Sequence, residues 1–238
     1  MSASSNEPVA WAERAADRSP MVLRSRARSI EQAKAMVDAA RRLIAQKGER
    51  FTTQELVKEA GVALQTFYRQ FEGKDQLLLA VMEDTIADGA AEFEAAARHL
   101  RDPLARLHFY VGAALEGVRD GDQFGPRFIT SEHWRLHQLF PNEMAHATKP
   151  VTDLFLREIT EARTRGLVEP ADPERAAWLM TKLIMATYHH YAFATEDERA
   201  ATVTEDVWTF CLAALGGTEQ DRDQPAGRRR RPSASTGR

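Results

Sequence analysis

The 238-residue chain has a single cysteine, Cys211, which excludes an internal disulfide and is typical of proteins in the reducing cytoplasm. No apolar run approaches the ~20 residues of a membrane-spanning helix, and the N-terminus lacks the basic start and apolar stretch of a signal peptide. Glycine-rich phosphate loops and Gly-x-Ser-x-Gly motifs are also missing. We therefore expect a cytoplasmic protein with no membrane association, no enzymatic activity and no cofactor.

The net charge is small, but the charged residues are unevenly distributed. The net charge is −3. Between Val22 and Lys74 there are 11 Lys and Arg against 6 Asp and Glu, whereas between Asp75 and Leu215 there are 13 against 23. A basic segment attached to an acidic body places positive charge where a phosphate backbone could bind, while the body repels nucleic acid.

The two ends of the chain show little hydrophobic periodicity. We expect residues 1–27 to be a flexible extension and residues 216–238 to be a flexible tail. Alternate arginines at Arg24, Arg26 and Arg28 could form an extended arm in a minor groove, or could simply be solvated. The arginine run 228–231 has the same two interpretations, and a solvated tail is the favoured one.

Everything between the ends has a helical pattern. Apolar residues recur at three- and four-residue steps from Ile30 to Ile44, and Gly48 ends that helix. Alternating patterns typical of strands are missing. Proline and glycine divide the remainder into segments of helical length, at about 74–97, 103–119, 126–138, 142–165, 173–193 and 201–215. The fold class is therefore predicted to be all-α.

The most informative stretch runs from Phe51 to Leu78. Thr52 followed by Glu55 forms a capping box, so a short helix is expected to begin near Thr53. Gly61 can take the left-handed conformation of a tight turn. A second short helix is expected from about Leu64 to Phe71. Two short helices joined by such a turn form a helix-turn-helix, whose second helix fits the DNA major groove.

The second helix has an apolar side and a polar side. Phe67 and Phe71 lie four residues apart and are expected to face inward. The outward residues can contact DNA, since an amide pairs with adenine, a guanidinium pairs with guanine or phosphate, and hydroxyls suit phosphate oxygens. The ammonium at the start of the next helix adds an anion site. The predicted DNA-binding residues are Thr52, Thr53, Gln65, Thr66, Tyr68, Arg69 and Lys74.

This stretch resembles the TetR family of bacterial transcription regulators. The resemblance rests on the Thr-Thr pair, the turn Ala60-Gly61-Val62, the triplet Thr66-Phe67-Tyr68, and Phe71, Lys74 and Leu77. One position departs from the family, because Ala63 stands where a serine or threonine usually caps the recognition helix. Losing such a cap costs about 0.5–2 kcal/mol, so local stability must come from packing.

The resemblance implies a three-helix DNA-binding domain at residues 28–73 and a larger helical domain for effector binding and dimerisation at residues 74–215. It also implies a homodimer on double-stranded operator DNA, most often a repressor, whose last two helices pair with their copies. The bulky residues of the middle helices suggest a small, largely apolar effector. The predicted ligand-binding residues are Phe109, Phe128, Trp134, Met144, Trp178, Met185 and Tyr188.

Other functions find less support in the sequence. His133 and His137 have a spacing that could hold one metal ion, but no metalloprotease pattern accompanies them, and we expect no metal site. The main alternative is a helical ligand-binding or adaptor protein without an operator.

Overall fold

The structure, a computed structural model, describes residues 17–116, 124–193 and 202–217, and over these residues it is all-helical with no strand. The arginine run 228–231 lies outside the described residues. The elements are α2 Pro20–Lys47, η1 Gly48–Arg50, α3 Thr53–Ala60, α4 Leu64–Gln70, α5 Lys74–Ala97, α6 Pro103–Glu116, α7 Phe124–Leu139, α8 Pro141–Ala147, α9 Lys149–Thr164, α10 Pro173–Ala192 and α11 Val203–Ala214. None of the helices in the described part of the chain is both long and apolar enough to cross a membrane.

Helix α2 begins earlier than the sequence pattern predicted. Residues up to 27 were expected to be flexible, but the helix starts at Pro20. Proline is well suited to the first helical position, because its fixed φ is helical and its missing N–H would have had no partner there. Arg24, Arg26 and Arg28 therefore lie on a helix, and the proposed extended arm is wrong for these positions. Gly48, at φ 67°, ends the helix as expected.

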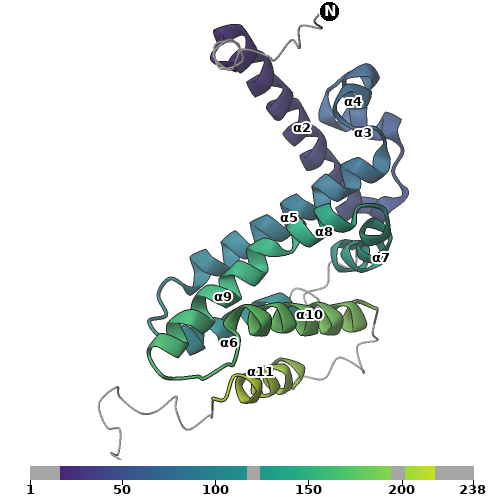
Figure 1. Ribbon diagram of the computed structural model, residues 1–238. Helices are drawn as coiled ribbons and strands as arrows, with labels where there is room; N and C mark the ends of the chain where they lie inside the picture. Colours follow the sequence, from purple (N-terminus) through teal and green to yellow (C-terminus); the bar gives the residue numbers. More distant parts are fainter. Residues whose placement is uncertain (1–16, 117–123, 194–201, 218–238) are drawn as a thin grey trace, which may run out of the picture.

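The N-terminal helices share one hydrophobic core. Helices α2, α3 and α4 gather at one end of the molecule, as Figure 1 shows. Their buried side chains include Met36, Leu56 and Phe67, which pack against Leu77 and Met82 of α5. Helices α3 and α4, of eight and seven residues, are too short to be stable alone, and the first turns of α5 complete the core that they share with α2.

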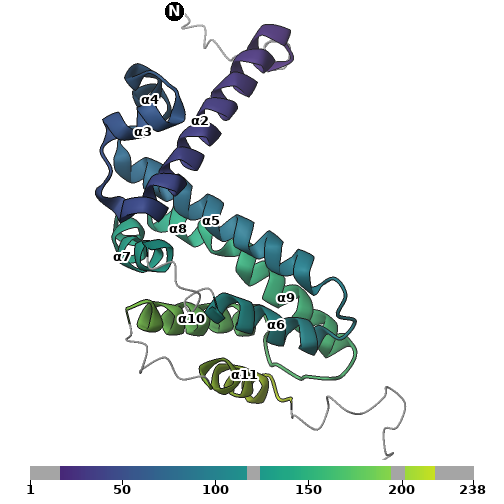
Figure 2. The ribbon, with the colours of Figure 1, turned by 180° about the vertical axis from the view of Figure 1, so that it is seen from behind.

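A second core holds the body together. It is built from α6, α9, α10 and α11 with the last turns of α5, and it includes Tyr110, Phe155 and Trp208. The rear view in Figure 2 shows α6 beside α10, with α11 on the far side of α10 from the α2–α4 end. Helix α5 thus contributes buried residues to both cores, Leu77 to Met82 to the first and Ala90 and Ala97 to the second.

The segment predicted as one helix at 142–165 consists of two. Helix α8 ends at Ala147, Thr148 follows, and α9 begins at Lys149. Pro150 has no N–H to donate to the carbonyl of the preceding turn, so a continuous helix would lose a hydrogen bond and clash at this point. The break leaves α8 against the N-terminal core through Met144 and α9 against the body core through Phe155.

One buried ion pair links α6 to α9. The carboxylate of Glu158 is only 2% exposed, and it lies 2.6 Å from Nη2 of Arg106. Arg106 Nε also donates to Glu158 Oε2 at 2.7 Å, and its Nη1 donates to the Leu100 carbonyl at 2.9 Å. The other carboxylate oxygen accepts from Arg157 Nε at 3.1 Å. Every polar group of this pair is therefore hydrogen-bonded, which a buried charge requires.

Removing one partner should be costly. We expect Arg106→Met to lower the free energy of unfolding by about 3 kcal/mol, because it leaves the buried Glu158 carboxylate short of its main partner. The matched control, Lys149→Met, breaks the exposed pair with Asp153 and should cost less than about 1 kcal/mol. Urea denaturation compares the two, and an equal, small loss in both variants would contradict the assigned role of the pair.

Candidate nucleic-acid interface and apolar pocket

The start of α3 is fixed by a complete capping box. Thr52 Oγ1 accepts a hydrogen bond from the Glu55 backbone N–H at 3.2 Å, and the Thr52 N–H donates to Glu55 Oε2 at 2.7 Å. Hydrogen bonds from Lys47 and from Thr52 lower the pKa of the Glu55 carboxyl to about 2. Phe51 and Leu56 are buried on either side of the cap. This confirms the local structure predicted from the sequence.

The turn between α3 and α4 depends on Gly61. It lies at φ 65° and ψ 30°, in the left-handed region that a residue with a side chain adopts only with strain. The Val62 N–H that follows donates to the Val57 carbonyl at 3.0 Å, which closes the turn. Val62 is half-buried against the N-terminal core. The glycine thereby sets the direction in which α4 leaves α3.

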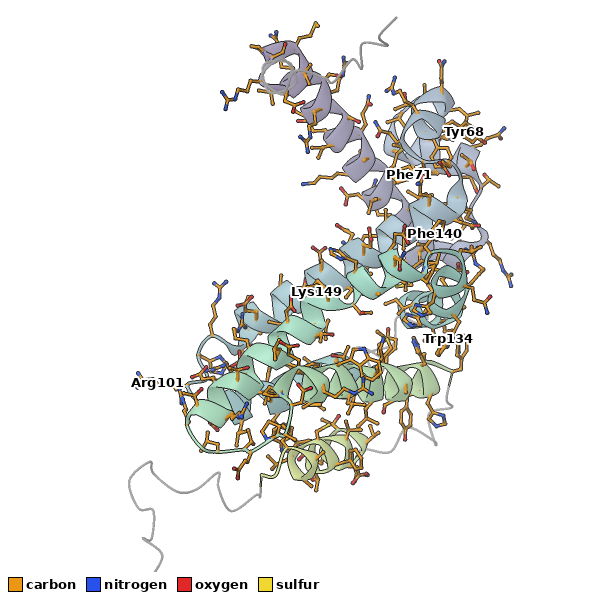
Figure 3. All side chains as sticks on the ribbon, viewed as in Figure 1. Tyr68, Phe71, Arg101, Trp134, Phe140 and Lys149 are labelled. Carbon is orange, nitrogen blue, oxygen red and sulfur yellow. The ribbon has the colours of Figure 1, made fainter. Side chains whose placement is uncertain are left out.

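Helix α4 presents its polar side to solvent. Phe67 and Phe71 are buried, as predicted, with ring centroids 5.9 Å apart. Gln65 and Arg69 are exposed, and Tyr68 is 59% exposed. Figure 3 shows Tyr68 at the outer end of the molecule, on the far side of α5 from the body.

Contacts with α2 and packing hold α4 in place without a cap. Ala63 occupies the cap position in extended conformation, and its side chain makes no capping hydrogen bond. Gln70 Nε2 donates to Ser29 Oγ at 2.7 Å, and Arg69 Nη2 donates to Gln32 Oε1 at 3.1 Å. These bonds to α2 replace part of the local stability that a capping side chain would have supplied.

Lys74 has a structural role that the sequence did not indicate. Its Nζ donates to the Phe51 carbonyl at 2.9 Å and lies 4.4 Å from the centroid of the Phe51 ring. The ammonium therefore joins the start of α5 to the start of α3. Thr52, next to Phe51, is exposed, and Thr53 is half-buried. The threonine pair and the first turn of α5 lie close together on this edge of the domain.

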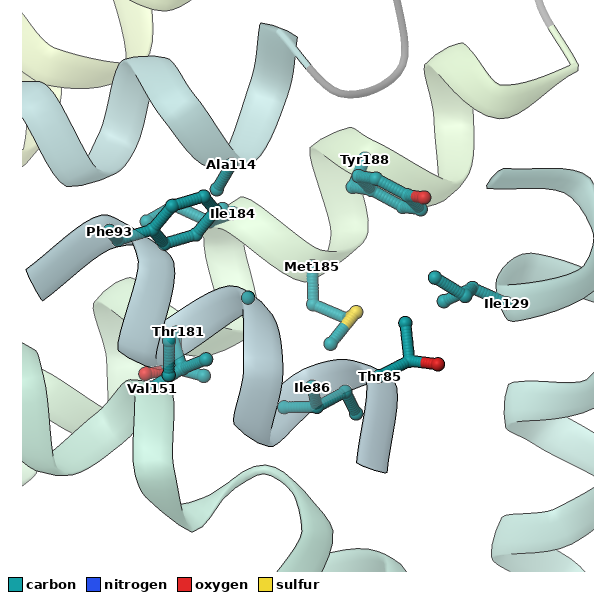
Figure 4. A pocket seen from close by; sticks show the side chains of 12 residues that line it. Thr85, Ile86, Phe93, Ala114, Ile129, Val151, Thr181, Ile184, Met185 and Tyr188 are labelled. Atoms are coloured by element: carbon teal, nitrogen blue, oxygen red, sulfur yellow. The ribbon is translucent and has the colours of Figure 1, made fainter. Parts of the chain in front are cut away.

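An apolar pocket lies midway along α5. Its volume is about 140 Å³, and its walls come mainly from α5 and α10, with one residue each from α6, α7 and α9 (Figure 4). The lining residues are Thr85, Ile86, Gly89, Ala90, Phe93, Ala114, Ile129, Val151, Thr181, Ile184, Met185 and Tyr188. Polar groups in this lining are few, namely two threonine hydroxyls and the Tyr188 phenol. Such a site suits an apolar molecule of about one aromatic ring, since an apolar cavity of ~150 Å³ binds benzene.

Two of the seven predicted ligand-binding residues, Met185 and Tyr188, line this pocket. The other five lie elsewhere. Phe128 and Met144 are buried in the N-terminal core, where they pack α7 and α8 against α2 and α5.

The remaining three are Trp134, Trp178 and Phe109. Trp134 is 63% exposed and Trp178 is also exposed, while Phe109 packs on the outside of the body core. Their bulk alone therefore did not indicate which of the predicted residues line this pocket.

The α5 wall of the pocket was missed. Residues 85, 86, 89, 90 and 93 recur at three- and four-residue steps, so they form one stripe on a helix. Small or short side chains dominate this stripe, among them Gly89 and Ala90, and such residues leave space rather than fill it. A search for small residues on one face of the long helix would have found this wall.

The two histidines considered for a metal lie one helical turn apart on α7. The rings of His133 and His137 stack, with centroids 6.1 Å apart. Among the described residues, no group of three or more His, Cys, Asp or Glu side chains is arranged to hold a metal ion.

Comparisons with known proteins agree with this geometry. Residues 36–81, from the middle of α2 to the start of α5, match the model of the bacterial regulatory proteins of the tetR family. No curated protein sequence matches the chain significantly.

Solved structures match the fold over most of its length. RolR in complex with resorcinol aligns with a TM-score of 0.60 at 17% identity, over 83% of this chain and 96% of that one. FadR from Bacillus subtilis, in complex with stearoyl-CoA, aligns with a TM-score of 0.57 at 17% identity, over 76% of this chain and 98% of that one. A tetR-family regulatory protein from Rhodococcus RHA1 aligns with a TM-score of 0.55 at 22% identity, over 79% of this chain and 98% of that one. Residues 36–81 are thus similar to the bacterial regulatory proteins of the tetR family, and the chain as a whole shares the all-helical fold of these structures.

Proposed function

We propose that the chain is a homodimeric, ligand-responsive repressor that binds operator DNA through α4. A small, largely apolar effector in the pocket between α5, α7 and α10 would release it. The observation that carries this proposal is the path of α5. The helix begins beside the recognition helix, lines the pocket with its middle turns and ends in the body core.

The polar side of α4 supports the DNA-binding part of the proposal. Gln65 can pair with the donor and acceptor of adenine, and Arg69 with guanine or with phosphate. The hydroxyls of Thr66 and Tyr68 suit phosphate oxygens, which position the protein without reading the sequence. Gln65, Tyr68 and Arg69 are exposed and Thr66 is half-buried, so a groove can receive this side of the helix.

The edge formed by Thr52, Thr53 and Lys74 completes the proposed interface. Backbone N–H groups in the first turns of α3 and α5, together with the Lys74 ammonium, favour a phosphate at this edge. Because Lys74 also donates to the Phe51 carbonyl, its substitution would disturb the fold and the phosphate contact together. Gln65 is therefore the better residue for testing the interface.

The pocket lining supports an apolar effector. Nine of its twelve residues have no side-chain hydroxyl, amide or charge. The fold neighbours RolR and FadR are described with resorcinol and with stearoyl-CoA, so this architecture holds both an aromatic ring and an acyl group. We propose that the present chain binds its effector against Met185 and Tyr188 of α10 and the small-residue stripe of α5.

The length and position of α5 support a lever-like switch. With 24 residues it is about 36 Å long. A ligand that separates α5 from α10 at the pocket would tilt the start of α5 and thereby change the spacing of the two recognition helices. Moving a population from 1:99 to 99:1 takes about 5.5 kcal/mol of differential binding. Burial of about 200 Å² more apolar surface in the released state would supply that, at ~25 cal/mol per Å².

Exposed apolar side chains support the homodimer. Trp178 and Leu179 on α10 and Phe210 on α11 are exposed in the single chain. Phe210 is 66% exposed, whereas Trp208, two residues before it, lies in the chain's own core. We propose that a second copy covers Phe210, since large exposed apolar groups mark an interaction surface.

The recognition helix can be tested by selecting an operator from random duplexes. Wild-type protein should select a roughly palindromic site, and Gln65→Ala should lose about 1–3 kcal/mol of affinity for it and relax base preference at one position per half-site. Gln138→Ala, an exposed glutamine of α7, is the matched control and should bind like wild type. If no duplex is selected, the alternative of an adaptor without an operator holds. Wild-type binding by the Gln65 variant would remove α4 from the interface.

The dimer can be tested by placing a charge at its proposed centre. Phe210→Glu should sediment as a monomer at micromolar concentration and lose operator affinity, because a carboxylate buried between the two copies has no partner. Leu139→Glu places the same charge at another exposed apolar side chain, on α7, and should remain dimeric. A dimeric Phe210 variant would show that this residue lies outside the interface.

A further inference from the structure

Two histidines contact each other where α7 packs against α10. The rings of His133 and His189 have centroids 4.8 Å apart. His189 Nδ1 lies 3.0 Å from Thr130 Oγ1, which fixes the orientation of its ring. His133 is 6% exposed, so the pair is shielded from water on the side of α7.

Each histidine leaves one buried nitrogen without a hydrogen-bond partner. These atoms are His133 Nδ1 and His189 Nε2, and they are two of the few such side-chain atoms within the described residues. Buried polar groups in proteins are almost always hydrogen-bonded, because an unmade bond costs free energy. Two neighbouring histidine nitrogens without partners therefore indicate a site that binds a polar group.

The pair lies one helical turn beyond the pocket. His133 follows the pocket residue Ile129 by four positions on α7, and His189 follows the pocket residue Met185 by four positions on α10. Residues four apart lie on the same face of a helix, about 6 Å along its axis. Both histidines thus continue the two walls of the pocket. They are not among the lining residues, but they place polar groups next to one end of a cavity whose lining is mostly apolar.

The two imidazoles are uncharged near neutral pH. Burial lowers the pKa of His133 to about 4, with further contributions from His189, Lys182 and His137. Burial also lowers the pKa of His189. A neutral imidazole carries one N–H donor and one acceptor nitrogen. Such a pair matches a hydroxyl group, which both donates and accepts, better than it matches a carboxylate, which only accepts and would bring a charge into an apolar site.

We propose that His133 and His189 form the polar end of the effector site and bind the hydroxyl of a phenol whose ring occupies the pocket. This inference rests on the proposed function of the pocket and names the chemical class of its ligand. The cavity of about 140 Å³ has room for one ring with a short alkyl substituent. The hydroxyl would satisfy the two nitrogens that lack partners in the described structure.

The test uses the full-length protein and three probes of one shape, 4-ethylphenol, ethylbenzene and 4-ethylbenzoate. Calorimetry should show 4-ethylphenol binding at least about tenfold more tightly than either of the others. His133→Phe and His189→Phe keep the ring but remove the nitrogens. Both variants should bind 4-ethylphenol and ethylbenzene with nearly equal affinity. His137→Phe, on the same helix, is the matched control and should keep the wild-type preference.

The other outcomes distinguish failure of the hydroxyl site from failure of the pocket as an effector site. Equal binding of phenol and hydrocarbon by wild type, or tighter binding of the benzoate, would overturn the hydroxyl site and leave the apolar pocket in place. Stoichiometric binding of Zn²⁺ that either histidine variant abolishes would replace it with a metal site. If none of the three probes binds while the protein still binds its selected operator, the pocket itself is wrong as an effector site, and the proposed release mechanism fails with it. Retained operator binding by the variants shows that they are folded.

Discussion

The sharing of α5 between two hydrophobic cores is the constraint on which the rest of the structure depends. Leu77 to Met82 complete the N-terminal core, on which the short helices α3 and α4 depend for their stability. Ala90 and Ala97 belong to the body core. A rigid helix anchored at both ends transmits a displacement at its middle to either end, and the pocket lies at that middle. Helix α7 also connects the pocket with the N-terminal core, since Phe128 and Leu136 pack in that core while Ile129 lines the pocket.

The helix-turn-helix could be predicted from the sequence almost residue by residue, because local interactions determine it. The capping box at Thr52 and Glu55, the left-handed Gly61 and the inward pair Phe67 and Phe71 each act within a few residues of the chain, and each has the predicted geometry. The long helix from Lys74 to Ala97 also has its predicted bounds. These features need no knowledge of how distant segments pack.

What could not be predicted depends on tertiary packing. The sequence shows that Phe128 and Met144 are bulky, but only the fold shows that they join α7 and α8 to the DNA-binding helices. The sequence pattern places the domain boundary at Lys74 because α5 begins there. The first turns of α5 nevertheless pack in the N-terminal core. The bond from Lys74 to the Phe51 carbonyl and the meeting of His133 with His189 join residues 23 and 56 positions apart, beyond the reach of any local pattern.

The claim that pocket occupancy is coupled to DNA binding through α5 is tested most directly by filling the pocket with the protein's own side chain. Gly89 lies in the pocket wall, and a Cβ placed there meets no atom within 4 Å. Operator affinity should fall about tenfold or more in Gly89→Met, because the new side chain acts as a permanent ligand, while Ala87→Met, exposed on the same helix, should bind like wild type. Unchanged operator affinity in a folded, dimeric Gly89→Met protein would contradict the coupling.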